Sequence, residues 1–149
     1  MKKKKNTPGR IVNRRARFDY ELGNDLVAGI MLSGRETKAL RQGHGHLRGS
    51  FVTVKDGELM LTNATIASGK NFIIPEEEQT RSRKLLANKK QINALIDSKK
   101  QGNTIVPLEF IISGRFIKVR IATGRGKKNY DKRESLKKRD QMRDAARNY

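Results

Sequence analysis

Basic side chains gather in three short segments of this chain, and their spacing suits the binding of a phosphate polymer. The segment 124–133 combines two glycines, five Lys or Arg side chains and one aromatic ring. Residues 125–149 hold too few apolar side chains to form a core. We therefore expect this tail to be disordered in the free protein and to take shape against RNA. Its candidate binding residues are Lys127, Lys128, Tyr130, Asp131, Lys132 and Arg133.

The second segment, residues 13–20, places three guanidinium groups within four positions and has two aromatic rings close by. Guanidinium groups pair with phosphates, and aromatic rings stack on bases. A solvated basic tail that leads into a strand has the same composition, so the pattern alone leaves both interpretations open. The candidate RNA-binding residues here are Asn13, Arg14, Arg17 and Tyr20.

The third segment, residues 80–86, is expected to form a helical turn. Arg81 and Lys84 are three positions apart and would share one face of that turn, with the two leucines elsewhere. They could form a phosphate clamp, although an amphipathic helix with ordinary surface charges explains the pattern equally well. The candidates are Arg81, Arg83, Lys84 and Leu86.

Other motifs fail as sites for catalysis or metal binding. His44 and His46 supply too few ligands for a metal, and residues 76–78 are three consecutive glutamates without a spaced ligand loop. A phosphate-binding loop ending at Lys127 would need glycine at Ile121 and Ser or Thr at Lys128. No nucleophile, base and orienting group assemble in the sequence. We expect no enzyme activity, no cofactor, no metal and no small-molecule substrate.

The charge distribution favours a nucleic-acid partner. The net charge is +19, of which residues 1–17 carry +8, residues 18–124 carry +5 and residues 125–149 carry +6. The two arms have no Trp and little Leu, so they do not resemble membrane anchors. No apolar run is long enough to span a bilayer, and cysteine is absent. We expect a soluble, cytoplasmic protein without a membrane partner.

Hydrophobic spacing predicts strands joined mostly by hairpins, with helices between them. The expected strands are residues 18–22, 27–32, 51–54, 59–62, 104–113 and 116–123. Asp56 and Gly57 predict a tight turn, and Pro107 predicts an edge position or a bulge. Residues 63–78 are expected to be a loop.

Two helices are predicted from their first turns. Ser33 with Glu36, and Asn88 with Gln91, have the spacing of reciprocal caps. The expected helices run from residue 34 to about 42 and from 88 to about 101. We therefore predict a mainly β protein with peripheral α-helices, in the form of a partly open β-barrel of the oligonucleotide-binding (OB) type. The expected organisation is a flexible basic arm (1–12), a barrel domain (13–124) and the basic tail (125–149).

Seven motifs in the same order resemble the SmpB (small protein B) family. The clearest are residues 13–20 (Asn-Arg-x-Ala-Arg-x-Asp-Tyr), 34–41 (Gly-x-Glu-Thr-Lys-x-Leu-Arg), 80–86 (Thr-Arg-x-Arg-Lys-Leu-Leu) and 118–133, which is nearly a signature by itself. The remaining motifs lie at residues 49–52, 56–58 and 106–108. The resemblance extends from residue 13 to about residue 140.

The resemblance implies an OB-fold barrel without catalysis that acts in trans-translation, the rescue of stalled ribosomes. The barrel would bind the tRNA-like end of tmRNA, and the tail would occupy the empty decoding site and mRNA channel of the small ribosomal subunit, where it becomes helical. An elongation factor carrying GTP would deliver the protein together with tmRNA. The partners implied are therefore tmRNA, small-subunit rRNA and, through tmRNA, that factor.

By position, Asn13 and Leu86 match family residues important for tmRNA binding, and Tyr130 matches the residue expected to stack on rRNA. Asp131, Lys132 and Arg133 match the functional triplet of the tail. The chain departs from the family at Val27, where an acidic residue is usual, and at Phe18, where histidine is usual. The leucine triplet is shortened to residues 85–87, and the tail ends soon after Arg147.

Three alternatives remain open from the residues. A generic ribosomal OB protein would bind rRNA permanently and cosediment with all ribosomes. An RNA-processing enzyme would turn over RNA, although no catalytic constellation supports one. A nucleoid protein would bind duplex DNA without preference for tRNA-like RNA.

Overall fold

The computed structural model describes residues 9–126. Four helices surround a β structure: α1 (Ala16–Asp19), α2 (Gly34–Arg41), α3 (Glu76–Gln79) and α4 (Lys89–Lys100). The strands are β1 (Arg10–Val12), β2 (Tyr20–Ile30), β3 (Gly45–His46), β4 (Phe51–Lys55), β5 (Glu58–Thr62), β6 (Thr65–Ile66), β7 (Arg83–Leu86), β8 (Thr104–Ile111) and β9 (Lys118–Gly126).

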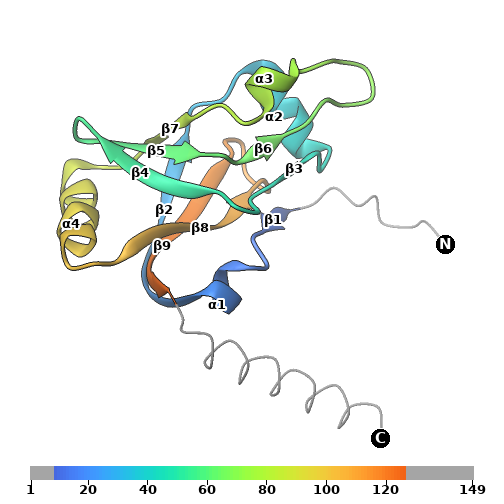
Figure 1. Ribbon diagram of the computed structural model, residues 1–149. Coiled ribbons are helices and arrows are strands. Elements are labelled where there is room, and N and C mark those ends of the chain that lie inside the picture. The colour runs from blue at the N-terminus through green and yellow to red at the C-terminus, as the bar shows by residue number, and fades with distance from the viewer. Residues whose placement is uncertain (1–8, 127–149) are drawn as a thin grey trace, which may run out of the picture.

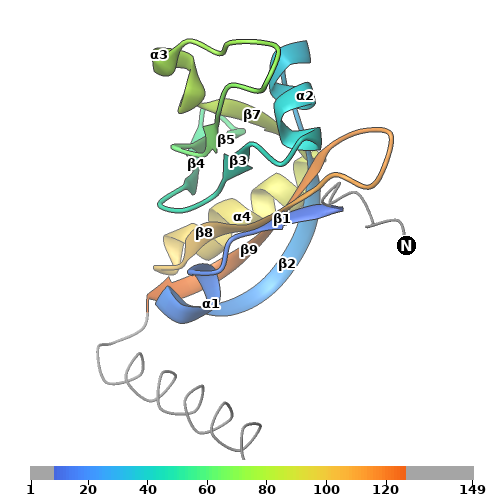
Figure 2. The ribbon, with the colours of Figure 1, turned by 90° about the vertical axis from the view of Figure 1, so that its right-hand side faces the viewer.

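Seven antiparallel strands form a sheet that closes on itself. Their order is β1-β8-β4-β5-β7-β2-β9, and β9 pairs again with β8. The shortest strand pairing in this closed sheet is between β4 and β8, whose register contains a single residue pair, Val52 with Ile105. The helices lie outside this barrel, with α2 and α3 at one end, α1 at the opposite end and α4 against the side (Figures 1 and 2). The predicted barrel with peripheral helices is confirmed.

The core fills the barrel with the inward residues of alternating strands. Leu59 and Leu61 of β5 are fully buried, and so are Val119 and Ile121 of β9. Phe110 of β8 joins the same cluster. Strand residues alternate between the two faces, so every second side chain of these strands is left for the outer surface, where a ligand can reach it.

The local signals for turns and helix starts are confirmed. Ser33 Oγ accepts a hydrogen bond from the Glu36 N–H, and Glu36 Oε1 accepts one from the Ser33 N–H. Asn88 and Gln91 make the same reciprocal pair. Asp56 and Gly57 both have positive φ, as the predicted turn requires. The register of β8 shifts between Pro107 and Glu109, in agreement with the predicted bulge.

The helical turn expected at residues 80–86 is wrong. Residues 83–86 form β7, which pairs with both β5 and β2. Leu85 is buried opposite Leu59 and Ile30, so pairing on both edges outweighs the helical spacing of the charges. The expected loop at 63–78 likewise contains β6 and the start of α3.

The N-terminal region also differs from expectation. Strand β1 pairs with β8 from Arg10 onward, inside the range expected to be a flexible arm. The strand expected at 18–22 begins only at Tyr20, after α1.

At the C-terminal end of the barrel, β9 continues to Gly126, two residues beyond the predicted domain boundary. The strand expected at 27–32 corresponds to the last part of β2, which ends at Ile30 and there is buried on one face only. No helix within residues 9–126 is long and apolar enough to cross a membrane.

Candidate RNA interface

Asn13 connects the start of α1 to strand β8. Its backbone N–H donates to the Leu108 carbonyl oxygen at 2.7 Å, and its Nδ2 donates to the Pro107 carbonyl oxygen at 2.8 Å. The residue is buried. Its amide therefore fixes the position from which the following arginines reach solvent.

Three arginines at or next to α1 form the α1 cluster, which we define as Arg14, Arg15 and Arg17. All three are exposed. Arg15 is held in place because its guanidinium lies 4.8 Å from the centre of the Phe18 ring and 3.4 Å from Asp19 Oδ1. Arg17 borders a hollow of about 310 Å³. Solvent-facing guanidinium groups on a fixed helical turn can pair with phosphates.

Leu86 belongs to a second candidate surface, on the outer face of β2 and β7. It is paired with Gly29, and a Cβ placed on that glycine would lie 3.3 Å from the Leu86 Cβ. The missing side chain at Gly29 therefore leaves room for Leu86 beside the β2 backbone. Val27 and Met31 share this face with Gly29, and the three side chains are 38% (Val27), 54% (Met31) and 50% (Leu86) exposed. We call Val27, Met31 and Leu86 the β2–β7 patch.

Cations border the β2–β7 patch on both sides. Lys84 of β7 forms an ion pair with Glu58 at 2.9 Å, and Lys118 of β9 is exposed opposite Gly29. Arg120 lies opposite Val27 and is paired with Asp25 at 3.2 Å and with Glu109 at 3.1 Å. An apolar centre with a basic border fits the sugar and base edges of a folded RNA next to its phosphates.

Arg83 does not lie on this surface, which corrects its prediction as a phosphate contact. Its side chain is fully buried. Nε donates to Glu36 Oε2 at 2.5 Å, and the other guanidinium nitrogens donate to the carbonyl oxygens of Ala64, Glu78 and Gln79. The group is therefore fully used in holding α2, α3 and β7 together.

Arg81 is bound to the same carboxylate, with Nε donating to Glu36 Oε2 at 3.1 Å and Nη2 to Oε1. Burial raises the pKa of Glu36, but hydrogen bonds from Arg81, the Ser33 N–H and Arg83 outweigh it and hold that pKa below its usual range. Burial lowers the pKa of Arg83, which the carboxylate of Glu36 opposes. The Arg81 side chain remains 41% exposed, so an RNA phosphate can reach it. Because its guanidinium is already bonded to Glu36, it would then be shared between the phosphate and that carboxylate.

The α1 cluster and the β2–β7 patch lie near opposite ends of β2. Tyr20 begins this strand and Gly29 lies near its end, so the two surfaces are on the order of 30 Å apart along the strand. Figure 1 shows α1 and β7 at the two ends of the barrel. Only a large ligand, such as a folded RNA, could contact both at once.

Comparisons with known proteins match this chain along almost its whole length. The family model described as SmpB protein matches residues 10–149. The chain belongs to the SmpB protein family. This confirms the resemblance seen in the sequence.

Relatives and a solved structure agree with the SmpB assignment. The SsrA-binding protein of Shouchella clausii is 45% identical over 144 residues, covering 95% of this chain and 92% of the relative. That of Chloroflexus aggregans is 45% identical over 140 residues, covering 91% and 87%. A structure described as "tmRNA-SmpB: a journey to the center of the bacterial ribosome" is 37% identical, with a TM-score of 0.68, and the match covers 86% of this chain and 94% of that one.

The SmpB signature run continues into the C-terminal tail, whose predicted binding residues lie outside the described residues. They are Lys127, Lys128, Tyr130, Asp131, Lys132 and Arg133. Strand β9 ends at Gly126, which pairs with Tyr20, the residue that follows α1. The last described residue therefore lies beside the end of α1.

Sequence reasoning missed several residues on the surface of this SmpB barrel. Lys118 and Met31 border or belong to the β2–β7 patch, and Phe51 and Lys99 line a hollow near Tyr20. The alternation in residues 118–121 was a usable signal, because it directs Lys118 and Arg120 outward. Among residues 9–126, no group of three or more His, Asp or Glu side chains is placed to hold a metal ion.

Proposed function

We propose that this protein binds tmRNA and, together with it, rescues stalled ribosomes by trans-translation. The observation that carries the proposal is the SmpB family match over residues 10–149, with relatives that are SsrA-binding proteins. The outer surface of the barrel supports it, because an apolar patch with a basic border and an arginine cluster suit a folded RNA.

The barrel and the tail have different tasks in this proposal. The β2–β7 patch and the α1 cluster bind the tRNA-like domain of tmRNA, with Leu86, Arg14 and Arg17 in contact and Asn13 positioning the arginines. The tail enters the vacant decoding site and mRNA channel, where Tyr130 stacks on rRNA and its cations pair with phosphates. The protein acts in the cytoplasm by binding alone, without catalysis, and an elongation factor carrying GTP delivers it with tmRNA.

Sequencing the RNA that copurifies with the full chain tests the proposal. We expect one dominant RNA with a tRNA-like end. Stoichiometric rRNA in all ribosome fractions, without such an RNA, would instead identify a permanent ribosomal protein. Degradation of the bound RNA by the purified protein would contradict a purely binding role.

Reversing the charge of the tail separates its task from that of the barrel. We expect Lys127, Lys128, Lys132 and Arg133, all changed to Glu, to leave the fold and tmRNA affinity nearly unchanged, because these residues follow the last barrel strand. Tagging of stalled peptides should fall strongly. The measurements are circular dichroism, a tmRNA gel shift and a reconstituted tagging assay; normal tagging by the variant would refute the role of the tail.

A further inference from the structure

A hollow of about 360 Å³ lies between α1, β4, β8 and the end of α4, away from the β2–β7 patch. Its lining combines two aromatic rings, Tyr20 and Phe51, with hydroxyl groups of Ser50, Thr53 and Thr104. This volume falls in the range of about 300–1,000 Å³ that is usual for small-ligand sites. The hollow adjoins the α1 cluster through Arg15, but the functions proposed above make no use of Phe51, Lys99 or the hydroxyl groups of its lining.

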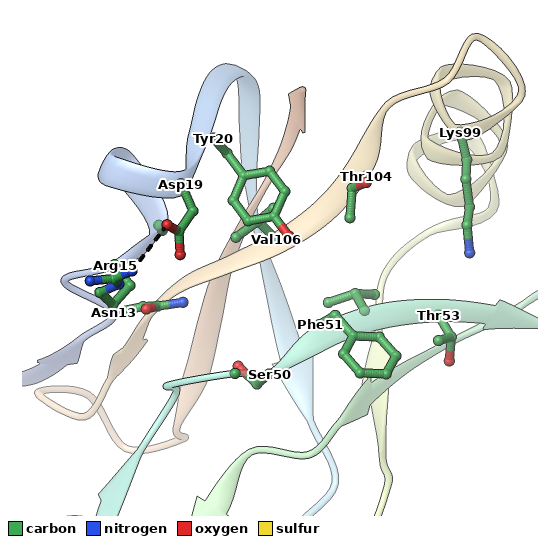
Figure 3. A pocket seen from close by; sticks show the side chains of 13 residues that line it. Asn13, Arg15, Asp19, Tyr20, Ser50, Phe51, Thr53, Lys99, Thr104 and Val106 are labelled. Atoms are coloured by element: carbon green, nitrogen blue, oxygen red, sulfur yellow. Dashed lines mark hydrogen bonds and ion pairs between the residues drawn. The ribbon is translucent and has the colours of Figure 1, made fainter. Parts of the chain in front are cut away.

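Tyr20 and Phe51 border the hollow from opposite sides. Figure 3 shows the Tyr20 ring on the side of α1 and the Phe51 ring on β4, with strand β8 running between them. Phe51 is 40% exposed, so a ligand can reach its ring. Both residues line the hollow, and an aromatic ring can stack on a planar ligand.

The charges around the hollow favour an anionic ligand. Arg15 and Lys99 line the hollow at opposite ends (Figure 3). Asp19, the one carboxylate in the lining, is ion-paired with Arg15. Within residues 9–126, Lys99 makes no ion pair. Its ammonium is therefore available for a phosphate. The C-terminal tail starts nearby, but its charge of +6 makes it a poor occupant beside these two cations.

We infer that this hollow binds one unstacked nucleobase of single-stranded or loop RNA. The base stacks on Phe51 and Tyr20, and the neighbouring phosphate pairs with Lys99. The hydroxyl groups of Thr53 and Thr104 line the space where they can hydrogen-bond to the edge of the base. Ser50 Oγ already donates to the Leu47 carbonyl oxygen, so it can only accept from the base. The inference depends on the proposed function only in that the protein meets RNA, and the nucleotide could come from tmRNA or from rRNA.

The test uses the full chain and a single-stranded RNA tetranucleotide that contains one 2-aminopurine, whose fluorescence falls when it stacks. We expect quenching on titration with the wild-type protein. Phe51→Ala should abolish most of the quenching and weaken binding about tenfold, as loss of one base–aromatic stack does. Phe51→Trp should restore both. Phe116→Ala, which truncates an exposed phenylalanine that does not line the hollow, should change neither.

Lys99→Glu provides an independent test on an exposed helix position, with Lys89→Glu at the other end of α4 as its control. We expect the first to weaken tetranucleotide binding several-fold and the second to leave it nearly unchanged. If Phe51→Ala does not fold, the tetranucleotide binding of Lys99→Glu and Phe51→Trp tests the inference instead. Equal quenching by wild type and the folded variants, or equal losses in the controls, would overturn the inference.

Two further binding measurements distinguish whether the base belongs to tmRNA or to rRNA. Phe51→Ala should weaken either tmRNA binding in a gel shift or ribosome binding in a sedimentation assay. Loss in the first identifies tmRNA, and loss in the second identifies rRNA. Wild-type protein that binds tmRNA without quenching the tetranucleotide would refute this hollow as a base site and leave the proposed function intact.

Discussion

A single buried carboxylate, Glu36, holds α2 to the strand β7 through Arg83. We expect Glu36→Gln to lower the free energy of unfolding by about 3 kcal/mol, because it leaves the Arg83 guanidinium buried without its counter-charge. Urea unfolding followed by circular dichroism measures the change. Glu58→Gln is the matched control: its pair with Lys84 is exposed to solvent, and it should cost less than about 1 kcal/mol. Equal effects would refute the structural role of Glu36.

The same carboxylate makes stability depend on pH in the acid range. Its pKa is lowered in the folded protein, because hydrogen bonds from Arg81, Ser33 and Arg83 outweigh burial. Its contribution is therefore complete above its unfolded pKa, about 4.3, and is lost as the pH falls through the lower folded value. Unfolding measured from pH 7 to pH 2 should show a smaller acid loss in Glu36→Gln than in wild type. Parallel curves would contradict this linkage.

At the scale of elements, the pairing of β2 with β7 determines the shape of the β2–β7 patch. We expect Gly29→Ala to change stability by less than about 1 kcal/mol, since the φ of Gly29 is not positive and the new methyl touches only a half-exposed leucine. It should displace Leu86 and weaken tmRNA binding several-fold. Gly34→Ala, where a Cβ meets nothing within 4 Å, is the control and should bind normally. Binding measured by gel shift decides between them.

Strand β7 shows that the spacing of charged residues within one segment does not determine its secondary structure. The charges at 81 and 84 have helical spacing, yet residues 83–86 pair along both edges with strands that begin 63 and 25 positions earlier in the sequence. Burial of Leu85 between two barrel strands outweighs a weak helical preference. As a result, Arg83 and Leu86 lie on opposite sides of the sheet, one in the interior and one on the candidate interface.

At the scale of the whole molecule, a net charge of +19 makes RNA binding depend on salt. Each phosphate that is neutralised releases counterions, so the logarithm of the affinity should fall linearly with the logarithm of salt concentration. Reversing two exposed arginines, Arg14→Glu with Arg17→Glu, should lower the magnitude of that slope by about 2. Filter binding to tmRNA at several salt concentrations measures it. An unchanged slope would exclude the α1 cluster from phosphate contact.

The sequence by itself determined the features whose partners are near in the chain. The helix starts at Ser33 and Asn88 and the turn at Asp56 follow from side chains within three positions of each other. The family followed from ordered motifs, and the barrel followed from the hairpins. The helix starts and the turn could be predicted because neighbouring residues alone set their geometry. The pairing of β2 with β9, which joins residues about 100 positions apart, could not be read from any single segment.

Only the tertiary structure decided which charges are free. Glu36 and Arg83 are 47 positions apart, and their contact turned an expected phosphate ligand into a buried structural group. The hollow between Tyr20 and Phe51 likewise exists only because β4, β8, α1 and α4 converge there. Exposure and pairing depend on contacts between distant segments, and the periodicity of a single segment carries no information about which other segment will cover it.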